Sequence, residues 1–149
     1  MLQLELSPIF AIDMNNARFA TIIHILTLLA KNTGQWSSSD WIAESIQINP
    51  VMVRRELAVL QEMGWVVSKK GKEGGSKLIV PSSAISLSDI LKATKGNHVL
   101  GRKNSCGGSN CPVGREINDE LDRLFGEADR ILFDALEQRS LKSFVDRFD

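Results

Sequence analysis

The part of the sequence that most constrains the fold is a capped amphipathic helix that leads directly into a glycine-rich hairpin. Asn49 is a favoured N-cap residue and Pro50 suits the first helical position, so a helix is predicted to begin here. Gly64 is expected to end it after about Met63. Apolar residues at i, i+4 and i+7 give this helix one core-facing side, which consists of Val53, Leu57 and Leu60.

After Gly64 the sequence changes to the pattern of a β-hairpin. Short apolar runs at 65–67 and 78–80 are predicted strands, and the basic segment KKGKEGGSK between them is the predicted turn. Upstream, residues 16–31 are apolar nearly all round and predict a buried helix, and the serines at 37–39 offer an N-cap for a short helix, DWIAESI. Three helices followed by a hairpin is the order of a winged helix-turn-helix.

Length and composition limit the possibilities further. The 149 residues correspond to one domain, with 43% hydrophobic and 24% charged residues, which is ordinary globular composition. No apolar run is long enough to span a bilayer and no signal-peptide pattern is present at the N-terminus, so we expect a cytoplasmic protein with no membrane partner. The formal net charge is zero, but residues 66–80 carry four lysines against one glutamate, whereas residues 112–149 carry ten acids against six bases. The basic segment is therefore the one suited to an anionic partner.

The helix that starts at Asn49 has the features of a DNA-reading helix. Arg54 and Arg55 lie on its outer side with Val51 and Ala58, where guanidinium groups can bind phosphates or guanine. Free N–H groups at the helix N-termini after Ser38 and Asn49 can bind phosphate. The alternative interpretation is a solvated charged face.

The hairpin turn is predicted to be a wing that contacts DNA. Its lysines supply positive charge, and its glycines let the backbone approach the duplex closely. The lysines are Lys69, Lys70, Lys72 and Lys77, and the glycines are Gly71, Gly74 and Gly75. The alternative is a soluble turn that protects the hairpin and binds nothing.

A long amphipathic helix is predicted from Pro112 to Glu137. Its apolar stripe alternates spacings of four and three and consists of Ile117, Leu121, Leu124, Ala128, Ile131 and Ala135. A winged domain of this size cannot cover the whole stripe, so we expect a homodimer through the 112–137 helix, which would bind double-stranded DNA at a palindromic operator. The alternative is that the stripe folds back on the helix at 16–31.

Cys106 and Cys111 flank a glycine-containing loop before this helix, and three interpretations stay open. The pair could form a redox switch, since Cys111 lies beside a helix N-terminus that favours a thiolate. It could contribute to a metal site, which would need His98 or a carboxylate as further ligands. The thiols could also be inert. No base is placed to activate Cys111, so we expect no catalytic residues and no enzymatic function.

Several motifs in fixed order resemble the Rrf-two family of bacterial winged-helix regulators. They are NNARFATIIHILTLLA, SSSDWIAESIQINPVMVRREL, LQEMGWVVSKKGKEGGSKLIV and ISLSDILKAT, and the resemblance is close from Met14 to about residue 97. It implies that Ser38, Pro50, Val51, Arg54 and Arg55 lie on the reading surface, and that Gly71, Lys72, Gly74 and Gly75 lie on a wing that enters the minor groove. Iron–sulfur members of the family carry three cysteines before the dimer helix. This chain has two and resembles the cluster-free members, so no cofactor and no bound metal is expected.

The sequence thus predicts a mainly α protein with a small β-hairpin, a winged helix-turn-helix domain plus a long C-terminal dimerisation helix. The expected divisions are an N-terminal extension at 1–13, the DNA-binding domain at 14–81, a linker helix and cysteine loop at 82–111, and dimerisation helices at 112–149. The predicted function is a transcriptional regulator, a repressor, that responds to thiol oxidation or to a small effector. The alternative is a winged-helix module that binds proteins and ignores DNA.

Overall fold

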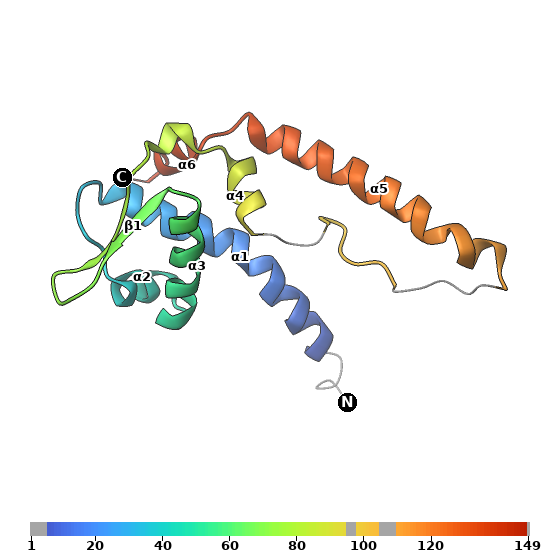
Figure 1. Cartoon of the computed structure of the whole chain (residues 1–149), viewed down its shortest axis with the longest axis horizontal. Coiled ribbons are helices and arrows are strands. Elements are labelled where there is room, and N and C mark those ends of the chain that lie inside the picture. Colours follow the sequence, from blue (N-terminus) through green and yellow to red (C-terminus); the bar gives the residue numbers. More distant parts are fainter. Residues whose placement is uncertain (1–5, 95–97, 105–109, 149) are drawn as a thin grey trace.

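The computed structural model describes residues 6–94, 98–104 and 110–148, with side chains from residue 17 onward. Figure 1 shows a compact body from which a long helix near the C-terminus extends, and the chain is mainly α with one β-hairpin, as predicted. The elements in chain order are α1 (Leu6–Lys31), α2 (Ser39–Ile46), α3 (Pro50–Glu62), β1 (Val66–Lys69), β2 (Gly75–Leu78), the 3-10 helix η1 (Ser82–Ala84), α4 (Leu87–Ala93), α5 (Pro112–Glu137) and α6 (Leu141–Val145).

The core of the body packs α2, α3 and α4 around α1. Ile22, Leu26, Ile42, Leu60 and Ile90 are each 0% exposed and belong to one cluster of buried side chains. Burying a side chain of this size contributes about 1.5–3 kcal/mol, so the cluster fixes α3 firmly against α1. The predicted inner face of α3 is confirmed, since Val53, Leu57 and Leu60 are all buried.

The first helix begins earlier than predicted. We expected a helix from residue 16 and a separate extension at 1–13, but α1 is continuous from Leu6. The segment 6–16 contains no glycine, and Pro8 falls in the first turn, where a missing N–H breaks no intrahelical hydrogen bond. A helix can therefore continue through residues that show no clear apolar period.

The two strands pair antiparallel and lie closer to the turn than predicted. Val66 pairs with Leu78 and Lys69 with Gly75, so the turn is shorter than the segment 68–77. Polar residues enter the strands because they find partners there: the Oγ atoms of Ser68 and Ser76 lie 2.8 Å apart. Runs of apolar residues alone could not reveal this register.

The last helix belongs to the body and not, as predicted, with the dimerisation helices of 112–149. Leu141 is 0% and Val145 8% exposed, and both pack in the same core as α1. The backbone N–H of Leu141 donates to the carbonyl of Ile85 at 2.8 Å, and that of Leu87 donates to the carbonyl of Arg139 at 2.8 Å. These bonds bring the chain back to the body after α5.

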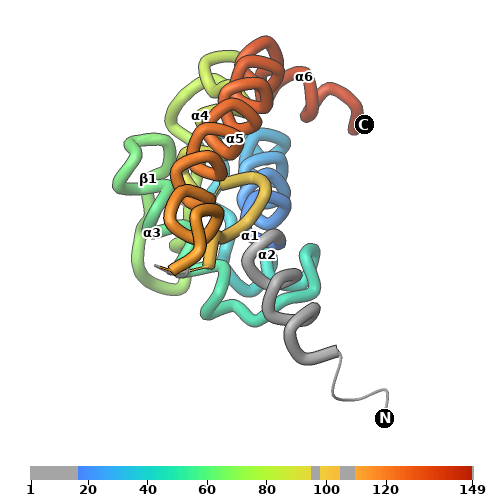
Figure 2. The backbone as a smooth tube through the Cα atoms, turned by 90° about the vertical axis from the view of Figure 1, so that its right-hand side faces the viewer, coloured from blue at the N-terminus to red at the C-terminus, as the bar shows by residue number. Residues whose placement is uncertain are grey.

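Helix α5 is long and mostly exposed. Cys111 precedes it in an extended conformation and Pro112 opens it, as predicted. Figure 2 shows its C-terminal half beside α4, and the two helices are in contact. Phe125 is its one buried residue. None of the helices in the described ranges combines the length and the apolar character that a membrane span requires.

Candidate nucleic-acid interface

The N-terminal end of α3 presents the residues predicted to read DNA. The Asn49 side chain caps the helix by accepting the N–H of Val51 at 2.9 Å, and Pro50 occupies the first turn. Val51, Arg54 and Arg55 are exposed, while the opposite side of the helix is buried in the core. The apolar side of α3 thus fixes which side chains face outward.

The wing is held against the helices by a third, short strand segment. The N–H of Ser37 donates to the carbonyl of Ser76 at 2.9 Å, and the N–H of Ser76 donates to the carbonyl of Ser37 at 2.8 Å. Gly75 makes this approach possible, because a Cβ atom there would lie 2.5 Å from the carbonyl oxygen of Ser37, and its φ is +146°. The wing and α2 are therefore fixed relative to each other through the backbone.

The wing lysines divide into two groups. Lys70 and Lys72 are exposed in the turn. Lys69 and Lys77 lie over the ring of Trp36, with Nζ to ring-centroid distances of 5.8 Å and 4.5 Å. Contact with an aromatic face stabilises a cation by about 0.5–1 kcal/mol at an exposed site, so Trp36 restrains these two side chains.

The basic side chains of α3 and of the wing have no ionic partners within the described parts of the chain. The six are Arg54, Arg55, Lys69, Lys70, Lys72 and Lys77, and none makes an ion pair with a described carboxylate. By contrast, Lys103, Arg123 and Lys142 are each paired with an acid elsewhere in the chain. The positive charge near α3 and the wing is thus free for an external anion.

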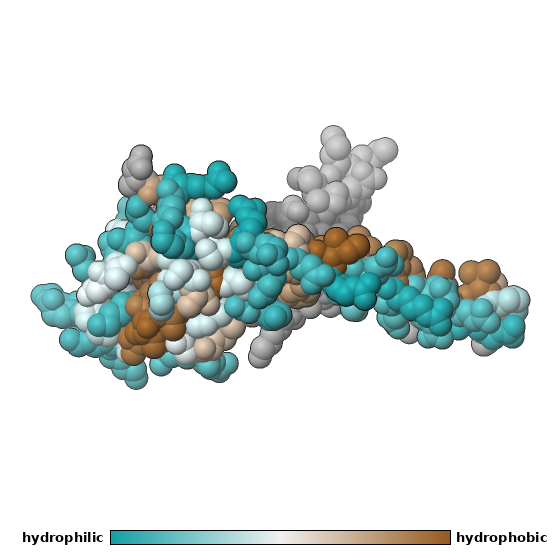
Figure 3. All heavy atoms as spheres, turned by 90° about the horizontal axis from the view of Figure 1, so that it is seen from above, coloured by the Kyte–Doolittle hydropathy of each residue, from teal (hydrophilic) through white to brown (hydrophobic). Residues whose placement is uncertain are grey.

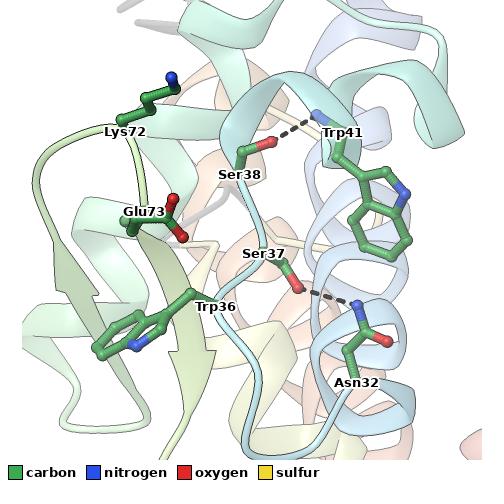
Figure 4. A pocket seen from close by; sticks show the side chains of 8 residues that line it. Asn32, Trp36, Ser37, Ser38, Trp41, Lys72 and Glu73 are labelled. Atoms are coloured by element: carbon green, nitrogen blue, oxygen red, sulfur yellow. Dashed lines mark hydrogen bonds between the residues drawn. The ribbon is translucent and has the colours of Figure 1, made fainter.

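A groove lies between the wing and the start of α2 (Figure 4). It connects the α2 cap with the turn of the wing, and both were predicted to contact DNA. It has a volume of about 390 Å³ and is lined by Asn32, Trp36, Ser37, Ser38, Trp41, Lys72, Glu73 and Gly74. Ser38 Oγ accepts the N–H of Trp41 at 3.1 Å, which confirms the predicted cap. Asn32, Trp36 and Trp41 were not predicted as site residues, although two tryptophans close to a serine cap were a visible signal.

A buried ion pair supports α3 from behind. Glu56, 2% exposed, accepts two hydrogen bonds from Arg18 of α1, from Nε at 2.8 Å and from the terminal guanidinium nitrogen Nη2 at 2.9 Å. Arg18 also donates to the backbone carbonyl of Thr94, where α4 ends, at 2.5 Å. The hydrogen bond to Glu56 raises the pKa of Arg18 further above its usual value. One residue therefore joins α1, α3 and α4.

The structure brings together most of the residues predicted from the sequence. Figure 1 shows α2, α3 and the hairpin grouped in the body, with α5 extending away from them. Ser38 and Lys72 line the same groove, and Gly74 and Gly75 shape the wing beside it. Gly71 has a φ of +105° in the turn, a conformation that favours glycine.

Of the two cysteines predicted to act as a sensor, one lies within the described residues. Cys111 is exposed at the N-cap of α5, and Cys106 lies outside the described residues. His98, considered as a further metal ligand, is engaged instead with α5: its Nδ1 lies 2.5 Å from Oδ2 of Asp129. The N–H of Val99 donates to the other oxygen of Asp129 at 2.8 Å, and these bonds lower the pKa of Asp129, the backbone bond contributing most.

Fold and surface together define a winged helix-turn-helix protein, and comparison with known proteins identifies its family. The model of the family described as "Rrf2: Iron-dependent Transcriptional regulator" matches residues 15–147. The chain belongs to the Rrf2 family, which consists of transcriptional regulators and not of enzymes. The resemblance seen in the sequence motifs is thereby confirmed.

Individual relatives agree with this assignment. The chain is similar to the proposed HTH-type transcriptional regulator YwnA of Bacillus subtilis (strain 168), with 33% identity over 132 residues, 89% of this chain and 97% of that protein. Among solved structures it is similar to a proposed DNA binding protein, with 34% identity, a TM-score of 0.66 and coverage of 84% of this chain and 96% of that one. A proposed transcriptional regulator from Lactobacillus plantarum has 25% identity and a TM-score of 0.72, with 85% of each chain covered.

The family description names iron, and the sequence offers few of the thiolates that usually hold an iron–sulfur cluster. An iron–sulfur cluster is held by four ligands, usually cysteine thiolates, and the whole sequence contains two cysteines. Within the described residues no three His, Cys, Asp or Glu side chains are gathered where they could hold a metal ion.

Proposed function

We propose that this regulator binds double-stranded DNA as a homodimer, with α3 of each protomer in a major groove and the wing in the adjacent minor groove. The DNA-contacting residues in this proposal are those of α3, of the α2 cap and of the wing. They comprise Ser38, Asn49, Pro50, Val51, Arg54, Arg55, Lys69, Lys70, Gly71, Lys72, Gly74, Gly75 and Lys77.

The observation that carries the proposal is the set of six basic side chains on α3 and the wing that make no ion pair with a described carboxylate. Lys and Arg that neutralise phosphates release counterions from DNA, and this release drives sequence-independent affinity. Arg54 and Arg55 are exposed on the helix that winged proteins insert into the major groove. Family membership gives the same expectation.

The apolar stripe of α5 supports the homodimer. Val113, Ile117, Leu124 and Ile131 are between 39% and 66% exposed, and Figure 3 shows brown side chains along this helix. A continuous apolar surface of this kind indicates a partner, and two-fold symmetry is the commonest arrangement of identical chains. A two-fold dimer presents two reading helices about 34 Å apart and so recognises a palindromic operator.

Regulation is proposed in three further parts. The protein acts as a repressor, because binding over a promoter excludes the polymerase. It acts in the cytoplasm, where bacterial DNA lies.

The chain works without an iron–sulfur cluster. A peroxide oxidises Cys111 and Cys106 to a disulfide: the two thiols give up two electrons and two protons, the peroxide is reduced to water, and the new bond shifts α5. Supporting this last part, Cys111 is exposed at the N-cap of that helix. Treatment with diamide, with the oxidised thiols identified by mass spectrometry, should then lower operator affinity; unchanged affinity would refute thiol control.

DNA binding is tested by fluorescence anisotropy with duplexes enriched from a random library. The logarithm of the binding constant should fall linearly with the logarithm of salt concentration. Lys72→Ala removes one phosphate contact per protomer and should lower the slope by about 2 for the dimer. Lys142→Ala, a lysine paired with Asp146 on α6, is the control and should leave the slope unchanged. No enrichment of any duplex would favour the alternative, a module that binds proteins.

The homodimer is tested by light scattering during gel filtration. Leu124 and Ile131 are 51% and 63% exposed, so Leu124→Glu with Ile131→Glu should leave the body folded and yield a monomer. Its DNA affinity should fall because one half-site is lost. A wild-type chain that elutes as a monomer at micromolar concentration would refute the dimer.

A further inference from the structure

Resting on the proposed function, we infer that Val51 reads a thymine in each operator half-site by contact with the C5-methyl group. The inference concerns one side chain in the first turn of α3. It specifies which base this turn recognises. Membership of the family does not give that information.

Val51 is unusual for its position. It is 53% exposed and is the one large apolar side chain on α3 that faces solvent. Valine is a weaker helix former than the polar residues that usually occupy exposed helical positions, so local preference gives no reason for it. Arg54 and Arg55 follow one turn later and are also exposed. An apolar group thus lies among the charges that would hold the helix against DNA.

The neighbours of Val51 cannot take over base recognition in this turn. The side-chain oxygen of Asn49 accepts the N–H of Val51 at 2.9 Å, so this cap holds the amide against the backbone, whereas recognition of adenine needs the oxygen and the NH₂ group to face the base together. Pro50 has neither a side-chain donor nor an N–H. The first turn therefore offers the bases mainly the methyl groups of Val51.

Only one feature of the major groove is complementary to such a surface. Every base edge there presents hydrogen-bond donors or acceptors, and thymine alone adds a methyl group. Removing one buried methyl changes an equilibrium constant by about fourfold at roughly 0.8 kcal/mol per group. A symmetric dimer that loses both contacts should lose about 15-fold.

The test replaces thymine by deoxyuridine, which lacks only that methyl group. Double-stranded DNA is first enriched from a random library with the full-length protein, and each thymine of the best duplex is then replaced in turn. Anisotropy titrations should find one thymine per half-site whose replacement weakens binding by about fourfold, and by about 15-fold when replaced in both half-sites.

Variants assign the effect to Val51. In Val51→Ala the penalty at that thymine should disappear, and in Val51→Thr, which keeps one γ-methyl, it should persist. Ile79→Ala is the matched control, since Ile79 is an aliphatic residue of 54% exposure that lies outside α3, and it should retain the wild-type penalty. Enrichment with penalties that do not depend on residue 51 would overturn this inference alone. Failure to enrich any DNA would overturn the proposed function as well.

Discussion

The body and α5 make opposite use of their apolar residues. In the body, α1 to α4 and α6 contribute to one buried cluster, and α3 alone buries Val53, Leu57 and Leu60. Helix α5 is twice as long as α3, with 26 residues against 13, and buries only Phe125. The body therefore folds on its own contacts, whereas α5 leaves most of its apolar side chains exposed or partly exposed.

The same truncation should have very different effects in the two regions. Leu60 is 0% exposed and Leu124 51% exposed. Leu60→Ala should lower the free energy of unfolding by about 2–5 kcal/mol, because it leaves a cavity in the core. Leu124→Ala should change the free energy of unfolding of the body little and weaken the dimer instead. Urea unfolding at fixed protein concentration measures the first effect, and a dilution series the second. Equal losses of unfolding free energy would contradict the comparison.

Breaking an ion pair should likewise lower the free energy of unfolding more in the body than in α5. Arg18→Met leaves Glu56 charged and buried, and we expect a loss of about 3 kcal/mol in unfolding free energy, the low end for a buried pair because Arg18 is itself 33% exposed. Arg123→Met breaks the pair with Glu120 on α5, where both side chains are more than 60% exposed, and should cost under about 1 kcal/mol. The double variant Arg18→Met with Glu56→Leu should recover stability. If it does not, the loss comes from the bond to Thr94.

Glycine substitutions extend the comparison to the backbone. Gly75→Ala would bring a Cβ to 2.5 Å from the carbonyl oxygen of Ser37, and should lower stability by about 2 kcal/mol and reduce DNA affinity as the wing shifts. Gly126 in α5 has open space around it, so Gly126→Ala should raise stability by about 0.5–1 kcal/mol. Thermal unfolding distinguishes the two. A stabilised Gly75→Ala would show that the wing is not fixed at Ser37.

The smallest expected effect is a pH dependence where His98 and Val99 bind Asp129 of α5. The pKa of Asp129 is lowered in the folded state, chiefly by the hydrogen bond from Val99 and also by His98. Its contribution to stability is therefore complete above the unfolded pKa of about 3.9 and is lost as pH falls through the folded value. Asp129→Asn should be less stable than the wild type at pH 7, with a difference that shrinks below about pH 4. A pH-independent difference in urea midpoint would contradict this.

Much of the fold could be predicted because its signals are local. The caps at Ser38 and Asn49 both form in the structure where the sequence indicated them. The apolar period of α3 identified its buried side correctly. Glu56 was the missed signal: it lies three residues after Val53, on the buried face, where a charge requires a partner.

The rest depended on contacts between distant residues. Neither the Ser37–Ser76 bonds nor the Arg18–Glu56 pair follows from any local preference, because the partners are 39 and 38 residues apart, as the numbering shows. The packing of α6 in the core is also a long-range outcome, because α6 follows α5 in the chain and its buried side chains pack in the same cluster as those of α1.

The sequence by itself determined which segments are helices, where α2, α3 and α5 begin, and which side of α3 is apolar, since capping and periodicity act over a few residues. The tertiary structure alone decided how the wing is held beside α2, which carboxylate is buried behind α3, and that α5 remains uncovered. Those outcomes depend on the packing of whole elements, where the free energy of burial, and not the preference of any one residue, selects the partner.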